Sequence, residues 1–185
     1  MKTKLNSMLI LVASLMLCQY VTSQNVMVGS EAMYPMKNIV ENAANSKVHT
    51  TLVAAVQAAG LIETLKSAGP FTVFAPVNDA FENLPSGTVE SLLKPEAKST
   101  LTKVLTYHVV AGKYDFDAIA KKIKAGNGKT TFATVSGGTL TAMMNGARNI
   151  TLKDENGGVA NITTYDVYQS NGVIHSIDAV VLPKM

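Results

Sequence analysis

The chain has 185 residues, of which 47% are hydrophobic and 16% are charged, and its formal net charge is +3. This length and composition predict one ordinary globular domain and exclude a disordered chain. There is no long basic run and no tryptophan, so we expect no nucleic-acid partner.

The first residues have the three-part pattern of a secretory signal peptide. Lys2 and Lys4 form a positive start, and an almost wholly apolar run follows over residues 5–17. That run is too short to span a bilayer comfortably as a permanent helix. We therefore predict a signal peptide over residues 1–23, cleaved after Ser23, and no stable membrane insertion of the mature chain.

The only cysteine, Cys18, lies in this leader, so we expect a mature domain without disulfides. A lipid anchor on Cys18 is an alternative, but such sites need a small residue just before the cysteine, where this chain has Leu17. Loss of Lys2 and Lys4 leaves 14 basic against 13 acidic residues, a net charge of +1. The mature chain therefore has no electrostatic reason to bind anionic membranes.

Helical patterns dominate the first half of the predicted domain. Residues 24–36 have mixed polarity and predict an irregular lead-in, and the domain itself is expected over residues 37–183. Helical spacing occurs at residues 39–44, then in a helix that Thr50 or Thr51 could cap and Gly60 could end, with a short helical turn at 61–66.

A strand and three further helices follow in the pattern. Residues 71–74 favour a strand, and Asn78 or Asp79 is expected to cap a short helix at 80–84. Thr88 could cap residues 89–93, Pro95 suits a helix start, and residues 107–110 favour a short strand.

Strands dominate the second half. Asp115 or Asp117 is expected to cap a helix that residues 126–128 end. Turn signals then separate segments typical of strands, at 130–135, 139–144, 150–153, 159–168 and 173–182. Helices lead, strands trail and connections are short, so the pattern predicts an α+β fold.

Four segments, in order, resemble motifs of the fasciclin domain family. They are residues 51–61, GPFTVFAPVNDAF at 69–81, LTYHVVAG at 105–112 and SNGVIHSIDAVVLP at 170–183. On these motifs the chain is identified as a single-domain, secreted, bacterial member of the family. The resemblance implies a β-sandwich-like wedge of about seven strands with several helices packed at one side, and a periplasmic or extracellular location.

The resemblance also indicates candidate binding residues. In some animal members the segment after the tyrosine–histidine pair is tied to contact with a partner, which makes Tyr107, His108 and Val109 the candidates here. The alternative is that His108 is bonded internally to backbone and only fixes the strand, since buried polar groups usually find internal partners. His175, in the final predicted strand, has the same structural explanation.

The sequence contains no motif of an enzyme, metal or cofactor site. It has neither a GxSxG elbow nor an HExxH pair. Asp154, Glu155 and Asn156 concentrate oxygen atoms that calcium would favour, but the spacing of a calcium loop is not met and Asn156-Gly157 predicts an ordinary hairpin turn. We therefore predict a protein without catalytic activity, metal or cofactor.

Two functions remain open from the sequence. The first is adhesion or contact with a surface or matrix, with a protein or polysaccharide as partner and self-association as a route to clustering. The second is a soluble carrier of a small apolar ligand. Adhesion predicts a broad polar face with an apolar centre, whereas a carrier predicts an apolar pocket.

Overall fold

The structure, a computed structural model, describes residues 25–184. The predicted signal peptide, its cleavage site and Cys18 lie outside these residues. None of the helices among residues 25–184 is long and apolar enough to cross a membrane.

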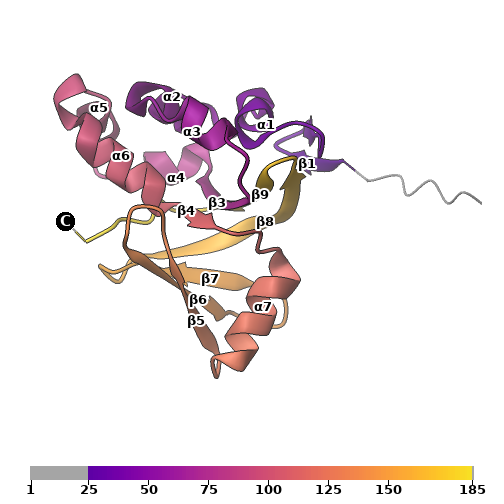
Figure 1. Cartoon of the computed structure of the whole chain (residues 1–185). Coiled ribbons are helices and arrows are strands. Elements are labelled where there is room, and N and C mark those ends of the chain that lie inside the picture. The colour runs from indigo at the N-terminus through magenta and orange to yellow at the C-terminus, as the bar shows by residue number, and fades with distance from the viewer. Residues whose placement is uncertain (1–24, 185) are drawn as a thin grey trace, which may run out of the picture.

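Helices and short strands make up the first part of the described chain (Figure 1). They are β1 (Val26–Val28), β2 (Glu31–Met33), α1 (Ile39–Asn45), α2 (Thr50–Ala59), α3 (Ile62–Lys66), β3 (Phe71–Pro76), α4 (Asn78–Glu82), α5 (Thr88–Leu92), the 3-10 turn η1 (Pro95–Ala97) and α6 (Lys98–Tyr107). The second part has one helix and six strands: β4 (Val109–Ala111), α7 (Phe116–Ala125), β5 (Lys129–Ala133), β6 (Thr139–Met144), β7 (Ile150–Lys153), β8 (Val159–Gln169) and β9 (Gly172–Ile177).

Seven of these strands form one curled sheet in the order β4-β3-β9-β8-β7-β6-β5. Only β3 and β9 run parallel; the other neighbours are antiparallel. A bridge between Val110 in β4 and Thr134, directly after β5, connects the two edges of the sheet, so the sheet is nearly a closed barrel. The predicted α+β fold with about seven strands is confirmed, with one continuous curled sheet in place of two sandwiched sheets.

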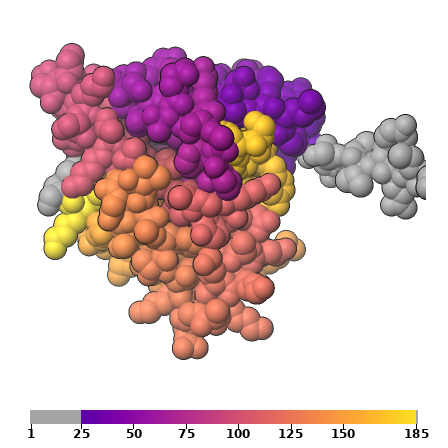
Figure 2. All heavy atoms as spheres, viewed as in Figure 1, coloured from indigo at the N-terminus to yellow at the C-terminus, as the bar shows by residue number. Residues whose placement is uncertain are grey.

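Two apolar cores lie on opposite faces of β3 and β9, because successive strand residues point to opposite sides. Phe74 and Ile177 belong to the core inside the curled sheet, which α7 closes with Ile119 and Ile123. Val73 and Ile174 belong to the outer core under α1, α2 and α6. Figure 2 shows the resulting two layers, with α1–α6 above and α7 with β5–β7 below.

The segment expected to be an irregular lead-in is a β-hairpin. Strands β1 and β2 pair in antiparallel register, and the turn residues Gly29 and Ser30 have φ values of 58° and 68°. Positive φ at both central residues is the requirement of the two-residue turn that best matches strand twist. Val28 and Met33 are both buried in the outer core, and this burial fixes the hairpin on the domain.

The central segment differs from its predicted strand. Helix α6 continues through Tyr107, and β4 begins only at Val109. The final strand is also shorter than predicted and ends at Ile177. A helix face and a strand look alike where apolar residues are contiguous, which explains the displaced boundary.

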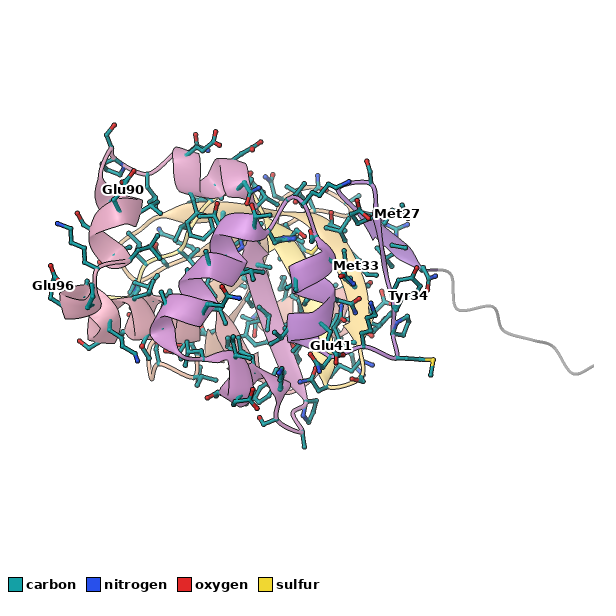
Figure 3. The ribbon with its side chains drawn as sticks, turned by 90° about the horizontal axis from the view of Figure 1, so that it is seen from above. Met27, Met33, Tyr34, Glu41, Glu90 and Glu96 are labelled. Atoms are coloured by element: carbon teal, nitrogen blue, oxygen red, sulfur yellow. The ribbon has the colours of Figure 1, made fainter. Side chains whose placement is uncertain are left out.

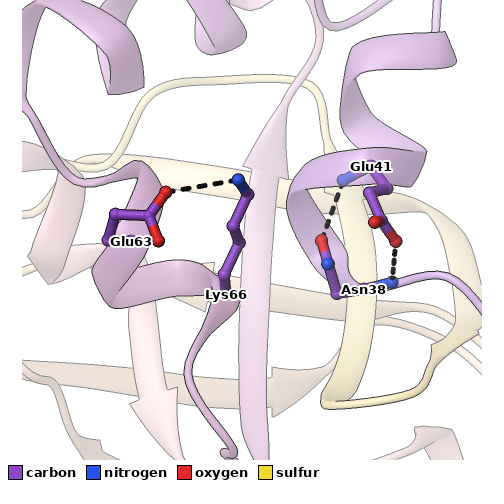
Figure 4. A network of polar contacts seen from close by, with 4 residues as sticks. All are labelled: Asn38, Glu41, Glu63 and Lys66. Atoms are coloured by element: carbon purple, nitrogen blue, oxygen red, sulfur yellow. Dashed lines mark hydrogen bonds and ion pairs between the residues drawn. The ribbon is translucent and has the colours of Figure 1, made fainter.

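Helix caps also differ in part from the sequence expectations. Asp115 caps α7 as predicted, accepting a hydrogen bond from the Ala118 N–H. Asn78 does not cap its own helix; its side-chain oxygen accepts from the Thr51 N–H at the start of α2. Helix α1 begins with a reciprocal capping box between Asn38 and Glu41, drawn in Figure 4 beside the exposed Glu63–Lys66 pair of α3.

Candidate functional site

An apolar pocket lies beneath α1, α2 and α3, where these helices cover β3, β4 and β9. Figure 3 shows the three helices lying over the strands, seen from above. The volume of the pocket is about 110 Å³. Its walls are aliphatic and aromatic side chains, principally Ile39, Val40, Leu52, Val53, Val56, Leu61, Leu65, Phe71, Leu105 and Ile174.

The helical spacing of apolar residues in α2 explains why the pocket exists. Leu52, Val53 and Val56 lie on one side of the helix because residues three and four apart share a face. Leu52 is buried in the outer core, whereas Val53 and Val56 are only partly buried. Ala43 and Ala44 of α1 line the pocket as well, and their short side chains leave the space between the helices unfilled.

The structure brings two of the three predicted site residues to this pocket. His108 and Val109 line it, directly after the end of α6. Tyr107 belongs instead to the core inside the curled sheet. Residues 107–109 therefore link the pocket to the opposite core.

His108 is buried and bonded at both ring nitrogens. Its Nδ1 lies 2.9 Å from the Val104 carbonyl oxygen, and its Nε2 lies 3.3 Å from the Val181 backbone nitrogen. Because Val181 can only donate here, Nε2 accepts and Nδ1–H donates to Val104. Burial lowers the pKa of His108 to about 4, so the ring is neutral near pH 7 and ties α6 to the C-terminal segment.

Tyr107 is fully buried, with its hydroxyl group at a junction of two loops. The hydroxyl donates to the Thr139 carbonyl at 2.5 Å and accepts from the Glu155 N–H at 3.2 Å. Burial raises the pKa of Tyr107 to about 12. Its role in the structure is to hold the β7–β8 turn beside the start of β6.

The other two histidines also have internal partners. His49 lies between the hydroxyl groups of Ser46, 2.8 Å from Nδ1, and Ser176, 3.3 Å from Nε2. His175 has its Nε2 2.8 Å from the Tyr114 carbonyl and accepts from the Asp166 N–H. Burial lowers the pKa of both, to about 4 for His49.

The oxygen-rich turn after β7 serves the fold. Asp154 accepts hydrogen bonds from the N–H groups of Asn156, Gly158 and Leu182, so its carboxylate closes the turn and holds the C-terminal segment. Among residues 25–184, no three His, Cys, Asp or Glu side chains converge as a metal site would require.

The pocket has the composition of a binding site for an apolar group. Its polar members besides His108 are Gln57, Thr64 and Thr106, and the Thr106 hydroxyl donates to the Thr102 carbonyl. Burial of apolar surface, at about 25 cal/mol per Å², would be the main source of affinity for such a group. The sequence predicted a helix around Val56 and a short helical turn at 61–66, with no pocket between them; the surplus of apolar residues over residues 52–65 was the available signal.

Comparison with known proteins found a matching family and several relatives. The fasciclin domain matches residues 47–183. Protein sll1483 of Synechocystis sp. is 46% identical over 166 residues, covering 89% of this chain and 83% of that protein. The cell surface glycolipoprotein MPB83 of Mycobacterium bovis is 32% identical over 170 residues, covering 89% of this chain and 69% of that protein.

A solved structure shows the same fold. A FAS1 domain pair from the insect cell adhesion molecule fasciclin I superposes with a TM-score of 0.69 at 18% sequence identity, covering 80% of this chain and 51% of that one. The family motifs, the curled seven-stranded sheet and these relatives agree: the chain belongs to the fasciclin domain family.

Proposed function

We propose that this protein is an exported, non-catalytic binding module that mediates cell adhesion or contact with an extracellular surface or matrix. The observation that supports this proposal is the apolar pocket beside His108 and Val109. Relatives named as a cell surface glycolipoprotein and as a cell adhesion molecule agree with it. The pocket would be the apolar centre of a contact face whose rim is polar.

The size of the pocket favours one anchoring side chain. Its volume of about 110 Å³ is somewhat below the ~150 Å³ of an apolar cavity that binds benzene. Pockets for larger ligands usually measure roughly 300–1,000 Å³. An aromatic or aliphatic side chain of a partner protein would fit, as at the centre of an interface hot spot.

Binding through one such anchor would be weak for a single domain. Useful strength would come from many copies on a surface or from self-association, since linked binding events multiply effective affinity. Surface or matrix proteins fit the pocket better than polysaccharides, because its walls are almost wholly carbon.

A filled-pocket variant tests the proposal. Val56→Trp would occupy the pocket, and Ala54→Trp on the exposed side of the same helix is the matched control. Beads coated with purified protein would be counted on cells that secrete it, and V56W should lower bead binding by roughly tenfold. Thermal unfolding would confirm that both variants fold; equal binding by V56W and the wild type would overturn the proposal.

The alternative function is a soluble carrier of a small apolar ligand in the periplasm or extracellular space. The same pocket supports it, since a ring or the end of a chain could enter between α1 and α2. Native mass spectrometry of the secreted protein separates the two. A retained small molecule that V56W loses would support the carrier; a ligand-free wild type would favour adhesion.

A further inference from the structure

A second hollow lies on the surface of the domain and shares no residue with the apolar pocket. Five segments meet there: the β1–β2 turn, the α1–α2 corner, the β3–α4 junction, β8 and β9. The volume of the hollow is about 270 Å³. Three valines and three hydrogen-bonding side chains make up most of its wall: Val28, Val48, Val77, Asp79, Thr164 and Ser176.

Two hydroxyl groups lie side by side on the floor of this hollow. Thr164 and Ser176 are directly opposite partners in the β8–β9 ladder, and opposite residues in an antiparallel pair project to the same face. Ser176 is only 1% exposed, although the strand around it is mostly apolar. A buried serine at this position needs a polar partner.

His49 supplies that partner from behind. Its Nε2 is 3.3 Å from the Ser176 Oγ, and Ser46 lies at its other nitrogen. Ser176 is thus satisfied inside the protein, and the partly exposed Thr164 is the floor hydroxyl that a ligand can reach. The Ser46–His49 pair fixes the orientation of Ser176.

A carboxylate completes the polar side of the wall. Asp79, in α4, is exposed at the rim. The neighbouring Asn78 is not free to bind, because its amide bridges the Thr51 N–H and the Lys47 carbonyl. Asn78 therefore holds the wall in place, while Asp79 offers two acceptor oxygens.

We propose that this hollow is a second binding site, separate from the apolar pocket, and that it takes one neutral pyranose ring. Such a ring presents hydroxyl groups at its edge and C–H groups on its face. Asp79 would accept charge-assisted hydrogen bonds from ring hydroxyls, and the Thr164 hydroxyl would donate or accept at the floor. The three valines would pack against the C–H face.

The same wall suits other ligand classes less well. A small amine would donate to Asp79 but has no broad C–H face to cover the three valines. The mixture of hydroxyl groups with valines disfavours a purely apolar ligand, which would cover the partly exposed Thr164 hydroxyl without giving it a partner. A sugar unit of a surface glycan could hydrogen-bond the polar side chains and pack its C–H face against the valines.

Titration with simple methyl glycosides tests this site. The methyl pyranosides of glucose, galactose and N-acetylglucosamine would be added up to about 100 mM to the ¹⁵N-labelled mature protein, since one ring is expected to bind with a Kd on the order of 1 mM. At least one glycoside should cause saturable shifts of the Gly29, Thr164 and Ser176 amide signals, which come from the hollow.

Two variants of α4 sharpen the result. Asp79→Asn should weaken binding by about tenfold, because it removes the charged acceptor. Glu82→Gln changes an exposed carboxylate on the same helix outside the hollow and should leave the Kd unchanged. Unperturbed Gly29, Thr164 and Ser176 signals with all three glycosides, or equal affinity in D79N and the wild type, would refute the sugar site.

The apolar-pocket variant keeps this outcome distinct from the proposed function. V56W should bind the glycoside as the wild type does, because Val56 does not line the hollow. Methylammonium would be titrated as a second probe. If it shifts the same signals and no glycoside does, the site is an amine site and the pyranose proposal is wrong.

Discussion

At the scale of single residues, the two neighbours in the tyrosine–histidine pair contact different parts of the domain. Tyr107 points into the curled sheet, whereas His108 lies beside the apolar pocket. Both are also structural, because their polar atoms bond backbone groups far away in the sequence. A mutation at either position therefore changes stability, and binding must be measured per folded molecule.

Tyr107→Phe should lower the free energy of unfolding by about 1–3 kcal/mol. The substitution removes the acceptor of the Glu155 N–H and the donor to the Thr139 carbonyl, and a polar group left unsatisfied in a buried place costs that amount. Urea unfolding measures the change. Tyr34→Phe, at a side chain that is 44% exposed, is the control and should stay within about 0.5 kcal/mol. Equal losses in the two variants would refute this role of Tyr107.

At the scale of elements, one side chain connects helices that are distant in the sequence. The Asn78 Oδ1 accepts from the Thr51 N–H at 3.1 Å and from the Thr50 hydroxyl at 3.2 Å, and its Nδ2 donates to the Lys47 carbonyl. Helix α2 thus obtains its N-terminal cap from the β3–α4 junction. The cap also fixes α2 above the apolar pocket.

Asn78→Ala should destabilise the protein by about 1–2 kcal/mol, the usual cost of losing an N-cap with its hydrogen bonds. Asn83→Ala is the matched control, because Asn83 is exposed at the end of α4 and should have little effect. Thermal unfolding of both variants gives the comparison. If N78A unfolds at the temperature of N83A, the cap contributes nothing and this explanation fails.

Local patterns predicted most elements of this fold, and a remote contact explains one of the errors. Helix α7, its cap Asp115 and the turns of the second half follow from nearby residues, as predicted. The cap of α2 could not be found locally, because Asn78 lies 27 residues from Thr51. The β1–β2 hairpin was missed although Gly29-Ser30 between short apolar segments is a hairpin signal.

The sequence predicted only part of the candidate site. Motif resemblance indicated residues 107–109, two of which line the pocket. Helical periodicity identified Leu52, Val53 and Val56 as one face. It could not show that Ala43 and Ala44 lie across from this face and leave it unfilled, because that depends on how α1 packs on α2.

At the scale of the whole molecule, three buried histidines join separate parts of the fold. His49 joins the α1–α2 corner to β9, and His108 joins α6 to the C-terminal segment. His175 joins β9 to the segment before α7 and to β8. At His108 and His175 one ring nitrogen accepts from a backbone N–H, so protonation would set two donors against each other as well as bury a charge.

These histidines should make the fold sensitive to acid. Burial lowers the pKa of His49 and His108 from 6.5 to about 4 in the folded state, so the unfolded chain binds more protons between these values. The unfolding free energy therefore keeps the whole contribution of these neutral histidines above about pH 6.5 and falls as the pH drops toward 4. For His108 alone the loss at pH 4 is on the order of 3 kcal/mol, measurable by urea unfolding across this range.

A variant separates the histidine effect from that of carboxylates, which also titrate in acid. His108→Gln keeps a polar side chain but cannot be protonated, so the slope of unfolding free energy against pH should fall by up to about 1.4 kcal/mol per pH unit between pH 4.5 and 6. The variant is expected to be less stable than the wild type at pH 7, and the two curves should converge on acidification. Parallel curves would show that His108 titrates equally in the folded and unfolded chains, and the acid sensitivity would then belong to other groups.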